Sequence, residues 1–358
     1  MGEKKIGREL SCKVLMVGEC FKGNAPGGMA AVVQYYNEYI DGLRYVASWK
    51  LSNFFVRLWY AVWGLLSIFF ILLIDRRIRL VHIHTAEGAS FWRNGLYLSL
   101  AKRMGRKTLL HVHASEFVRF YEESNKKEDI LSTIGKADLL IVLSESWRKY
   151  FIGIGVDESK ITVLHNITDY PSSRYEKDYG KVNMLFLGLI GPRKGVFELL
   201  SSMSKHKEEL RGKVELRIGG NTNEDRLREA IREGGLEEMV RFEGWVSGEK
   251  KKDLLGWANV YVLPSHNEGL PISILEAMSY GCAIISTPVG GIPEVVDDGY
   301  NGYLVDPGDE EGIFRAINSY VEDKAKIRDH GKGSKERVKE YLPDYVMKEL
   351  SGIYMRLL

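Results

Sequence analysis

The feature that most constrains how this chain can fold is its alternation of short apolar runs with longer amphipathic stretches. The apolar runs are continuous rather than broken by polar residues, which is typical of parallel strands that helices cover on both faces. In the first half they lie at residues 14–17, 45–48, 80–84, 108–113, 139–143 and 161–164. The stretches between them predict helices at residues 29–41, 54–74, 90–104, 126–135 and 144–152. This order of elements predicts an α/β domain built on a parallel sheet.

The alternation stops once and then restarts. Residues 168–181 (TDYPSSRYEKDYGK) are polar and aperiodic, so they are predicted to form a linker. Beyond them, strands are expected at residues 184–187, 215–219, 240–242, 260–263, 283–286 and 302–305, and helices at residues 196–205, 224–233, 249–256, 272–280 and 310–320. We therefore expect two doubly wound domains, 1–167 and 182–339, and a charged C-terminal helix at about 340–358 that packs back on the first domain. Ligands of open α/β sheets bind beyond the carboxyl ends of the strands, so two such domains facing each other would define a cleft.

Composition narrows the class of protein. Apolar residues make up 45% and charged residues 27% of the 358 residues, as in a folded globular protein. The formal net charge of +2 gives no reason to expect a nucleic-acid partner. Cys12, Cys20 and Cys282 are too few and too scattered for a disulfide framework, which favours a reducing compartment such as the cytoplasm. The charged opening MGEKKIGREL has no apolar region or cleavage site, so we expect no secretory signal.

One segment is apolar enough to raise the question of a membrane. Residues 58–74 (LWYAVWGLLSIFFILLI) carry no charge, and Arg76, Arg77 and Arg79 follow them. About 20 such residues are needed to cross a bilayer, so the run is at the lower edge of that length. A crossing would also interrupt the strand–helix order just before the apolar run LVHIH. We expect a helix buried against the sheet; a helix in the membrane surface is the main alternative, and a true span is the least favoured.

The strongest functional signal is the segment PSHNEGLPISILEAMSYGCAIISTPVGGIPEVV, which begins at Pro264 and follows a predicted strand. Pro271 suits the first turn of the next predicted helix, where N–H groups that point back at the loop favour a phosphate. Glu268 lies in the loop and Glu276 about one turn into the helix. Both carboxylates can therefore accept hydrogen bonds from sugar hydroxyls in one cleft. Taken as isolated glutamates, a helix cap and a solvent-facing side chain would be the simpler interpretation.

From Glu268 onward, this segment resembles, nearly position by position, the nucleotide-sugar-binding segment of retaining glycosyltransferase family 4. The hallmark of that family is two glutamates eight residues apart, followed by an EA-G-P-V-GG-PE pattern. The resemblance extends over essentially the whole chain, weakly in the first half and strongly in the second, and it implies the GT-B architecture. It implies that Glu268 contacts the transferred sugar and that Glu276 contacts the ribose. It assigns the cradle for the sugar and the diphosphate to Gly269, Leu270, Pro271 and Ile272.

Two further loops are suited to a diphosphate. Gly27 and Gly28, in NAPGGM, open the first long predicted helix and resemble the glycine loop that closes over the diphosphate in this family. Arg193 and Lys194, in LIGPRKG, follow the first strand of the second domain and can neutralise the diphosphate as it leaves. The family usually places a basic residue directly after the glycine at this strand end, where this chain has Leu189. Either Arg193 replaces that contact or the leaving group is stabilised less.

Four histidines end two predicted strands as His-x-His pairs, His82 with His84 and His111 with His113. Their period of two is compatible with a metal site. The resemblance implies a different role for His113, which it places beside the donor sugar. The chain also has no Asp-x-Asp, the usual metal clamp of the other major glycosyltransferase architecture, so we expect no metal and no cofactor. Asn166 lies where the family often has Pro-Asn-Gly and is a hinge or acceptor-side candidate.

These motifs together predict a hexosyltransferase that takes a sugar from a nucleotide-sugar donor, above all a UDP-sugar, with retention of configuration implied by the resemblance. The acceptor would be a glycan or a polyprenyl-linked glycan in capsular or exopolysaccharide assembly. The resemblance implies that the first domain takes the acceptor. Its basic and aromatic residues suit the inner face of the plasma membrane, although a solvated helix face would explain them nearly as well. Two alternatives stay open: a UDP-sugar epimerase on the same architecture, and a non-catalytic nucleotide-sugar-binding protein.

Overall fold

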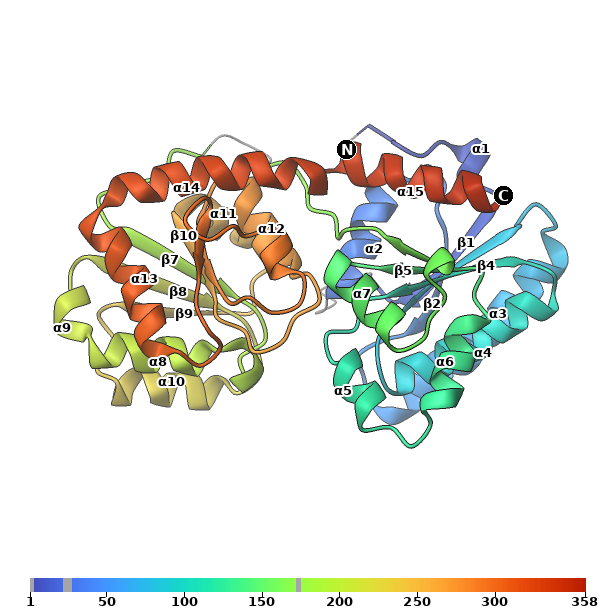
Figure 1. Ribbon diagram of the computed structural model, residues 1–358, viewed down its shortest axis with the longest axis horizontal. Coiled ribbons are helices and arrows are strands. Elements are labelled where there is room, and N and C mark those ends of the chain that lie inside the picture. The colour runs from blue at the N-terminus through green and yellow to red at the C-terminus, as the bar shows by residue number, and fades with distance from the viewer. Residues whose placement is uncertain (1–2, 22–27, 172–174) are drawn as a thin grey trace. The chain divides into compact units, whose positions relative to one another are not determined.

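The chain forms two compact units in a computed structural model that describes residues 3–21, 28–171 and 175–358 (Figure 1). The first unit comprises Met1–Ile167 together with Tyr341–Leu358, and the second comprises Thr168–Glu340. Each unit has one parallel sheet with helices on both faces (Figure 1). The predicted α/β class with two doubly wound sheets is therefore confirmed.

The sheet of the first unit has six parallel strands in the order β2-β1-β3-β4-β5-β6. The strands are β1 (Val14–Glu19), β2 (Arg44–Trp49), β3 (Leu80–Thr85), β4 (Lys107–Val112), β5 (Leu139–Val142) and β6 (Ile161–Val163). The helices are α1 (Arg8–Ser11), α2 (Gly28–Tyr39), α3 (Phe54–Ile74), α4 (Ala89–Arg103), α5 (Phe117–Glu122), α6 (Lys127–Gly135), α7 (Glu145–Gly153) and the C-terminal α15 (Pro343–Leu357). Every residue of β3 is buried, as expected for a strand that has helices on both sides.

The sheet of the second unit also has six parallel strands, in the order β12-β11-β10-β7-β8-β9. The strands are β7 (Val182–Leu187), β8 (Val214–Gly219), β9 (Val240–Gly244), β10 (Val260–Leu263), β11 (Ala283–Ser286) and β12 (Gly302–Leu304). The helices are α8 (Val196–Lys205), α9 (Lys207–Leu210), α10 (Glu224–Glu233), α11 (Gly248–Trp257), α12 (Ile272–Ser279), α13 (Glu310–Glu322) and α14 (Lys324–Arg337).

The strand order of the second sheet reverses between β7 and β10. From β7 the chain continues outward to β8 and β9, and it then returns to place β10 on the other side of β7. The loops that follow β7 and β10 therefore start from neighbouring strands at the point of reversal, and the crevice at the carboxyl ends of such strands is where open α/β sheets bind ligands. The 3₁₀ turn Pro192–Lys194 follows β7, and the loop that contains Glu268 follows β10.

The expectation that residues 58–74 are buried against the sheet is wrong for most of α3. Gly64, Ile68 and Leu72 are the buried residues of this helix, and they form one narrow stripe against the sheet. The large apolar side chains around the rest of the helix are exposed: Phe54, Phe55, Leu58, Trp59, Val62, Trp63, Leu66, Phe69, Phe70, Leu73 and Ile74. A helix on the outside of a sheet has only one face to bury, whatever its composition. By length and composition alone, Phe54–Ile74 would also be sufficient to cross a membrane.

Candidate functional site

The crevice between β7 and β10 brings together three of the residues predicted to act on the donor. Lys194 Nζ lies 2.5 Å from Oε1 of Glu268, and Nη1 of Arg193 lies 3.9 Å from Oε2 of the same carboxylate. Ser265 Oγ donates a 2.7 Å hydrogen bond to Oε1 as well. Glu268 is only 5% exposed, so this is a buried carboxylate between two cations and a hydroxyl. Buried charges need such partners because desolvation is costly.

The two loops that carry these side chains are also linked through their backbones. Arg193 Nη1 donates a 2.9 Å hydrogen bond to the carbonyl of Asn267, and the N–H of His266 donates to the carbonyl of Arg193 at 2.8 Å. Arg193 thus contacts the Glu268 loop through both its side chain and its main chain. Preorganised cations of this kind are suited to stabilising negative charge that develops on a leaving group.

Two glycines make this close approach possible. Gly195 has φ +69°, and a Cβ on it would lie 1.9 Å from the carbonyl oxygen of Pro264. Gly290 has φ +56°, and a Cβ there would lie 1.9 Å from the carbonyl oxygen of Glu268. Next to it, Gly291 donates a backbone hydrogen bond of 2.6 Å to the carbonyl of Gly269. A side chain at either position would both clash with the Glu268 loop and strain the left-handed backbone.

The helix that follows the loop begins one residue later than the proline. Pro271 is the N-cap, with φ −71° and ψ 118°, and α12 starts at Ile272, so Pro271 precedes the first turn instead of lying in it. Gly269, Leu270 and Pro271 are buried beside Glu268. The first N–H groups of any α-helix lack partners within the helix and point toward the preceding loop. The amide cradle for a diphosphate stays a prediction at this helix start.

Glu276 lies on α12 and has a different partner from Glu268. Its Oε1 is 2.6 Å from Nζ of Lys251, which comes from α11, and the residue is 7% exposed. Sequence reasoning missed Lys251, because nothing links it to Glu276 at a separation of 25 residues. It also missed Ser265, which lies within the recognised segment but is not part of the glutamate hallmark.

The remaining predicted residues belong to the first unit. Gly28 opens α2, whereas Gly27 lies outside the described residues. Asn166 is 5% exposed and follows β6. His113 follows β4, and its Nε2 is 2.8 Å from Nδ1 of His84. Burial lowers the pKa of His113 to about 3, so its ring is neutral near neutral pH.

The other histidines of the two pairs, His82, His84 and His111, are buried. With His113 they form a row of neighbouring rings, which we call the histidine ladder. His82 Nδ1 lies 2.8 Å from the hydroxyl of Tyr354 on α15, and His82 Nε2 lies 3.2 Å from Nδ1 of His111. Burial lowers the pKa of His82 to about 3, and it lowers that of His84 and His111 as well. One ring nitrogen from each of His82, His84 and His111 lies within 4.8 Å of the others, close enough for metal ligation to be considered. Both ring nitrogens of His82, however, already form hydrogen bonds.

A further ionisable group, which no sequence motif indicated, lies at the end of β1. Burial raises the pKa of Glu19 to about 7, and the nearby positive charge of Arg93 opposes this shift. In the first sheet the strand order reverses between β1 and β3, so Glu19 marks the corresponding crevice of that unit.

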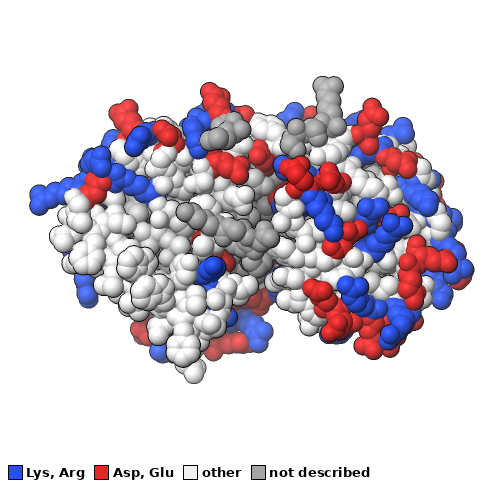
Figure 2. All heavy atoms as spheres, turned by 180° about the vertical axis from the view of Figure 1, so that it is seen from behind, with Lys and Arg blue, Asp and Glu red and all other residues white. Residues whose placement is uncertain are grey.

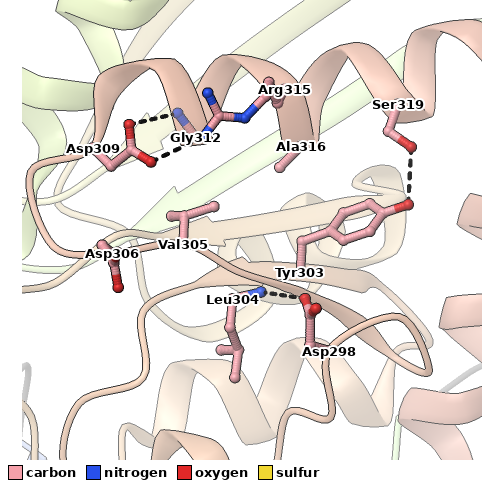
Figure 3. Close-up of a pocket in the computed structure, with 10 residues that line it drawn as sticks. All are labelled: Asp298, Tyr303, Leu304, Val305, Asp306, Asp309, Gly312, Arg315, Ala316 and Ser319. Atoms are coloured by element: carbon pink, nitrogen blue, oxygen red, sulfur yellow. Dashed lines mark hydrogen bonds and ion pairs between the residues drawn. The ribbon is translucent and has the colours of Figure 1, made fainter.

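A pocket of about 380 Å³ lies elsewhere in the second unit, beside β12 and α13 (Figure 3). Two of its three aspartates, Asp298 and Asp309, already accept hydrogen bonds from neighbouring residues. Asp309 accepts hydrogen bonds from the N–H of Gly312 at 2.8 Å and from Arg315 at 3.1 Å, and Asp298 accepts one from the N–H of Leu304 at 2.9 Å. None of the predicted site residues lines this pocket. We therefore take it to be a structural feature that is separate from the Glu268 site.

Comparisons with known proteins agree with this arrangement. A family model described as Glycosyl transferases group 1 matches residues 172–337, and one described as Glycosyltransferase Family 4 matches residues 30–170. An uncharacterized glycosyltransferase of Methanocaldococcus jannaschii, MJ1069, is 27% identical over 71% of this chain and 70% of its own length. The amylovoran biosynthesis glycosyltransferase AmsK of Erwinia amylovora is 24% identical over 60% of this chain, and the match spans about half of that protein (55%). Among solved structures, Anabaena HepE in complex with UDP-glucose has a TM-score of 0.73 at 16% identity and covers 96% of this chain and 99% of its own.

Two doubly wound units with an acidic and basic site at a strand-order reversal define a glycosyltransferase of the GT-B architecture. Residues 30–170 match the model of Glycosyltransferase Family 4 and residues 172–337 match that of Glycosyl transferases group 1, so both halves of the chain are of glycosyltransferase type. It is a hexosyltransferase, and the predictions of family, fold and enzyme class are confirmed.

Proposed function

We propose that this protein transfers a hexose from a UDP-sugar, with retention of configuration and without a metal, to a glycan or polyprenyl-linked glycan. The observation that carries the proposal is the contact between Lys194 and Glu268 at the crevice between β7 and β10. HepE, which has the same fold, binds UDP-glucose, and this supports a UDP-sugar donor. The similarity to AmsK supports a role in polysaccharide assembly.

The donor would bind with its diphosphate at Arg193, Lys194 and the start of α12. Two cations beside the crevice supply the charge that a divalent metal supplies elsewhere, and this favours transfer without a metal. Glu268 would accept hydrogen bonds from the transferred sugar and Glu276 from the ribose, while Gly28 would approach the diphosphate from the first unit. His113 would lie beside the donor sugar as a neutral ring that accepts or donates one hydrogen bond.

Transfer would proceed on one face of the sugar. The bond between the anomeric carbon and the diphosphate oxygen breaks, the acceptor hydroxyl attacks from the same side, and its proton passes to the departing phosphate. The diphosphate leaves as the nucleotide, which the two cations stabilise. Glu268 and His113 orient the sugar and form no covalent intermediate. Asn166 would act on the acceptor side or at the hinge, and the enzyme would work in the cytoplasm.

A panel of nucleotide sugars tests this proposal. The protein is incubated with each donor and with lipid-linked or soluble glycan acceptors, and free nucleotide is measured with and without EDTA. We expect one UDP-sugar to release UDP in proportion to acceptor, with an α-linked product from an α-linked donor and no loss of rate in EDTA. An isomerised donor without nucleotide release would support the epimerase, and binding without turnover would support a non-catalytic protein. Loss of activity in EDTA that Mn²⁺ restores would overturn the metal-independent mechanism.

A further inference from the structure

The outer face of α3 has no part in the proposed donor chemistry. Its large apolar side chains are exposed along the whole helix, from Phe55 at 78% through Trp63 at 56% and Phe70 at 52% to Ile74 at 79%. Figure 2 shows this side of the first unit as a broad area that is almost free of charged residues. A surface helix normally turns polar residues outward. Apolar area of this extent marks a surface that a partner or a membrane covers.

The inner face of α3 is tied to its own unit along its length. A Cβ on Gly64 would lie 3.3 Å from the Cα of Ser48, so the helix packs directly on β2. Tyr97 donates a 2.8 Å hydrogen bond to the carbonyl of Ala61, and Arg106 donates one of 2.9 Å to the carbonyl of Leu72. A helix fixed in this way covers one face of the sheet. If it left the sheet to cross a bilayer, that apolar face of the sheet would be exposed. The outer face is therefore available to one leaflet only.

Basic residues flank this apolar helix on both sides in the sequence. Six basic residues and one acidic residue, Asp75, lie between positions 44 and 79; the basic residues are Arg44, Lys50, Arg57, Arg76, Arg77 and Arg79. Asp75 forms ion pairs with Arg44 and with Arg77, so the excess stays positive. Arg57 lies in the first turn of α3 and Arg76 just after its end, which would place both ends of the helix among anionic headgroups. If a second copy of this chain bound to the same face, the basic residues that flank α3 in the two copies would come close together. Their repulsion disfavours a homodimer.

Aromatic side chains lie near the beginning of the apolar face. Trp59 and Trp63 are 63% and 56% exposed, and their rings stack with centroids 5.8 Å apart. Indole rings are enriched at membrane surfaces because one part of the ring is apolar while the N–H remains hydrated.

We propose that the outer face of α3 inserts into one leaflet of an anionic membrane, with the helix axis in the membrane plane. The apolar side chains enter the acyl region, while the arginines at both ends bind lipid phosphates. This is the arrangement of an interfacial helix and not of a transmembrane span. The inference does not rest on the donor chemistry, because α3 and the Glu268 site belong to different units.

Vesicle sedimentation without any nucleotide sugar tests the proposal. The full-length protein is mixed with vesicles of phosphatidylglycerol and phosphatidylcholine, and separately with phosphatidylcholine alone. We expect binding to the anionic vesicles that the double variant Trp63→Glu/Phe70→Glu weakens by roughly 100-fold, since each aromatic side chain contributes a large apolar area. Arg76→Gln/Arg79→Gln should weaken binding to anionic vesicles by roughly 20-fold and should leave binding to neutral vesicles unchanged.

The matched control also substitutes glutamate for two large apolar side chains, but these lie outside α3 and are similarly exposed. Tyr300 and Met355 are 50% and 63% exposed, and Tyr300→Glu/Met355→Glu should bind vesicles as the wild-type protein does. Circular dichroism of each variant verifies that the fold is intact. Equal binding by the α3 variant and the control, or no binding by the wild type, would overturn the proposal. A wild-type dimer that ignores vesicles and becomes monomeric in the α3 variant would assign the face to a second copy instead. Glu268→Gln should bind vesicles normally, so failure of the transferase proposal would be recognised separately.

Discussion

Lys194 and Glu268 form a buried ion pair, with Nζ 2.5 Å from Oε1, between the loops that follow two neighbouring strands of the second sheet. The lysine side chain is 14% exposed and that of the glutamate is 6% exposed. In an ion pair this buried, each charge offsets the desolvation cost of the other, so removing one partner leaves an unpaired buried charge that destabilises the folded state. Stability and activity therefore respond differently when one or both partners are replaced.

Replacement of Lys194 by Met should destabilise the protein, because Glu268 would remain as a buried carboxylate without its closest cation. We expect the free energy of unfolding to fall by about 3 kcal/mol and turnover to be nearly abolished. The double variant Lys194→Met/Glu268→Gln should regain most of the stability but none of the turnover. Lys205→Met removes the lysine partner of Glu310, which is 57% exposed, and should therefore lower the stability far less than Lys194→Met does. Urea unfolding and nucleotide release measure both effects, and recovery of activity in the double variant would contradict the assigned roles.

Gly290 should not tolerate a side chain. Gly290→Ala combines a positive φ with a Cβ 1.9 Å from the carbonyl of Glu268, so we expect it to displace this loop and to weaken UDP binding at least tenfold. Gly299→Ala is the matched control, since Gly299 also has a positive φ, +75°, but open space around its Cβ position. Gly299→Ala should lower the free energy of unfolding by only about 1 to 2 kcal/mol through backbone strain, and its affinity for UDP should stay that of the wild type. Calorimetric titration with UDP compares the two, and equal affinities would show that the contact is unimportant.

Glu276→Ala should act on donor binding more than on chemistry. A carboxylate that holds ribose hydroxyls contributes equally before and during transfer, so its loss raises KM and leaves kcat little changed. We expect KM for the donor to rise roughly tenfold, the value of one charge-assisted hydrogen bond. Steady-state kinetics with the preferred donor provide the measurement. A fall in kcat with constant KM would place Glu276 at the reacting carbon instead.

Acid should destabilise the first unit through its buried histidines. Burial lowers the pKa of His82 and His113 from 6.5 to about 3, so the folded state keeps these rings neutral where the unfolded chain takes up protons. Stability is therefore complete above about pH 6.5 and falls as pH decreases toward 3, by roughly 1.4 kcal/mol per pH unit for each proton taken up. Urea midpoints measured between about pH 7 and pH 5 should show this fall. His111→Leu should make the fall less steep, and an unchanged slope would argue against the ladder as its origin.

Much of the fold was accessible from the sequence, because continuous apolar strands between amphipathic helices leave few alternatives to a doubly wound sheet. The strands at β7, β10 and β11 begin and end within two residues of their predicted limits. The environment of α3 was not accessible. A helix that is apolar around its whole circumference has the same sequence whether protein or lipid covers it, and only the exposed side chains distinguish the two. The short helices α1, α5 and α9 were also missed, since four to six residues are too few to establish a period.

For the site, the motif identified the residue types but not their partners. Glu268, Arg193 and Lys194 were expected from their loops, and the strand order explains why loops 74 residues apart meet. The pairing of Glu276 with Lys251 depends on how α11 and α12 pack, which no local pattern encodes. Gly290 belongs to the recognised pattern, but its steric contact with the Glu268 carbonyl is apparent only in three dimensions.

The central claim is that the Glu268 loop is the donor site of a transferase, and the rate of nucleotide release tests it most directly. Wild-type protein, Glu268→Gln and Glu310→Gln are compared with the preferred UDP-sugar and acceptor; Glu310 is a second lysine-paired glutamate of the same unit. We predict that Glu268→Gln loses about 100-fold or more of the rate, as expected when a group at the reacting sugar is removed, while Glu310→Gln keeps nearly all of it. Near-normal nucleotide release by folded Glu268→Gln would contradict the account.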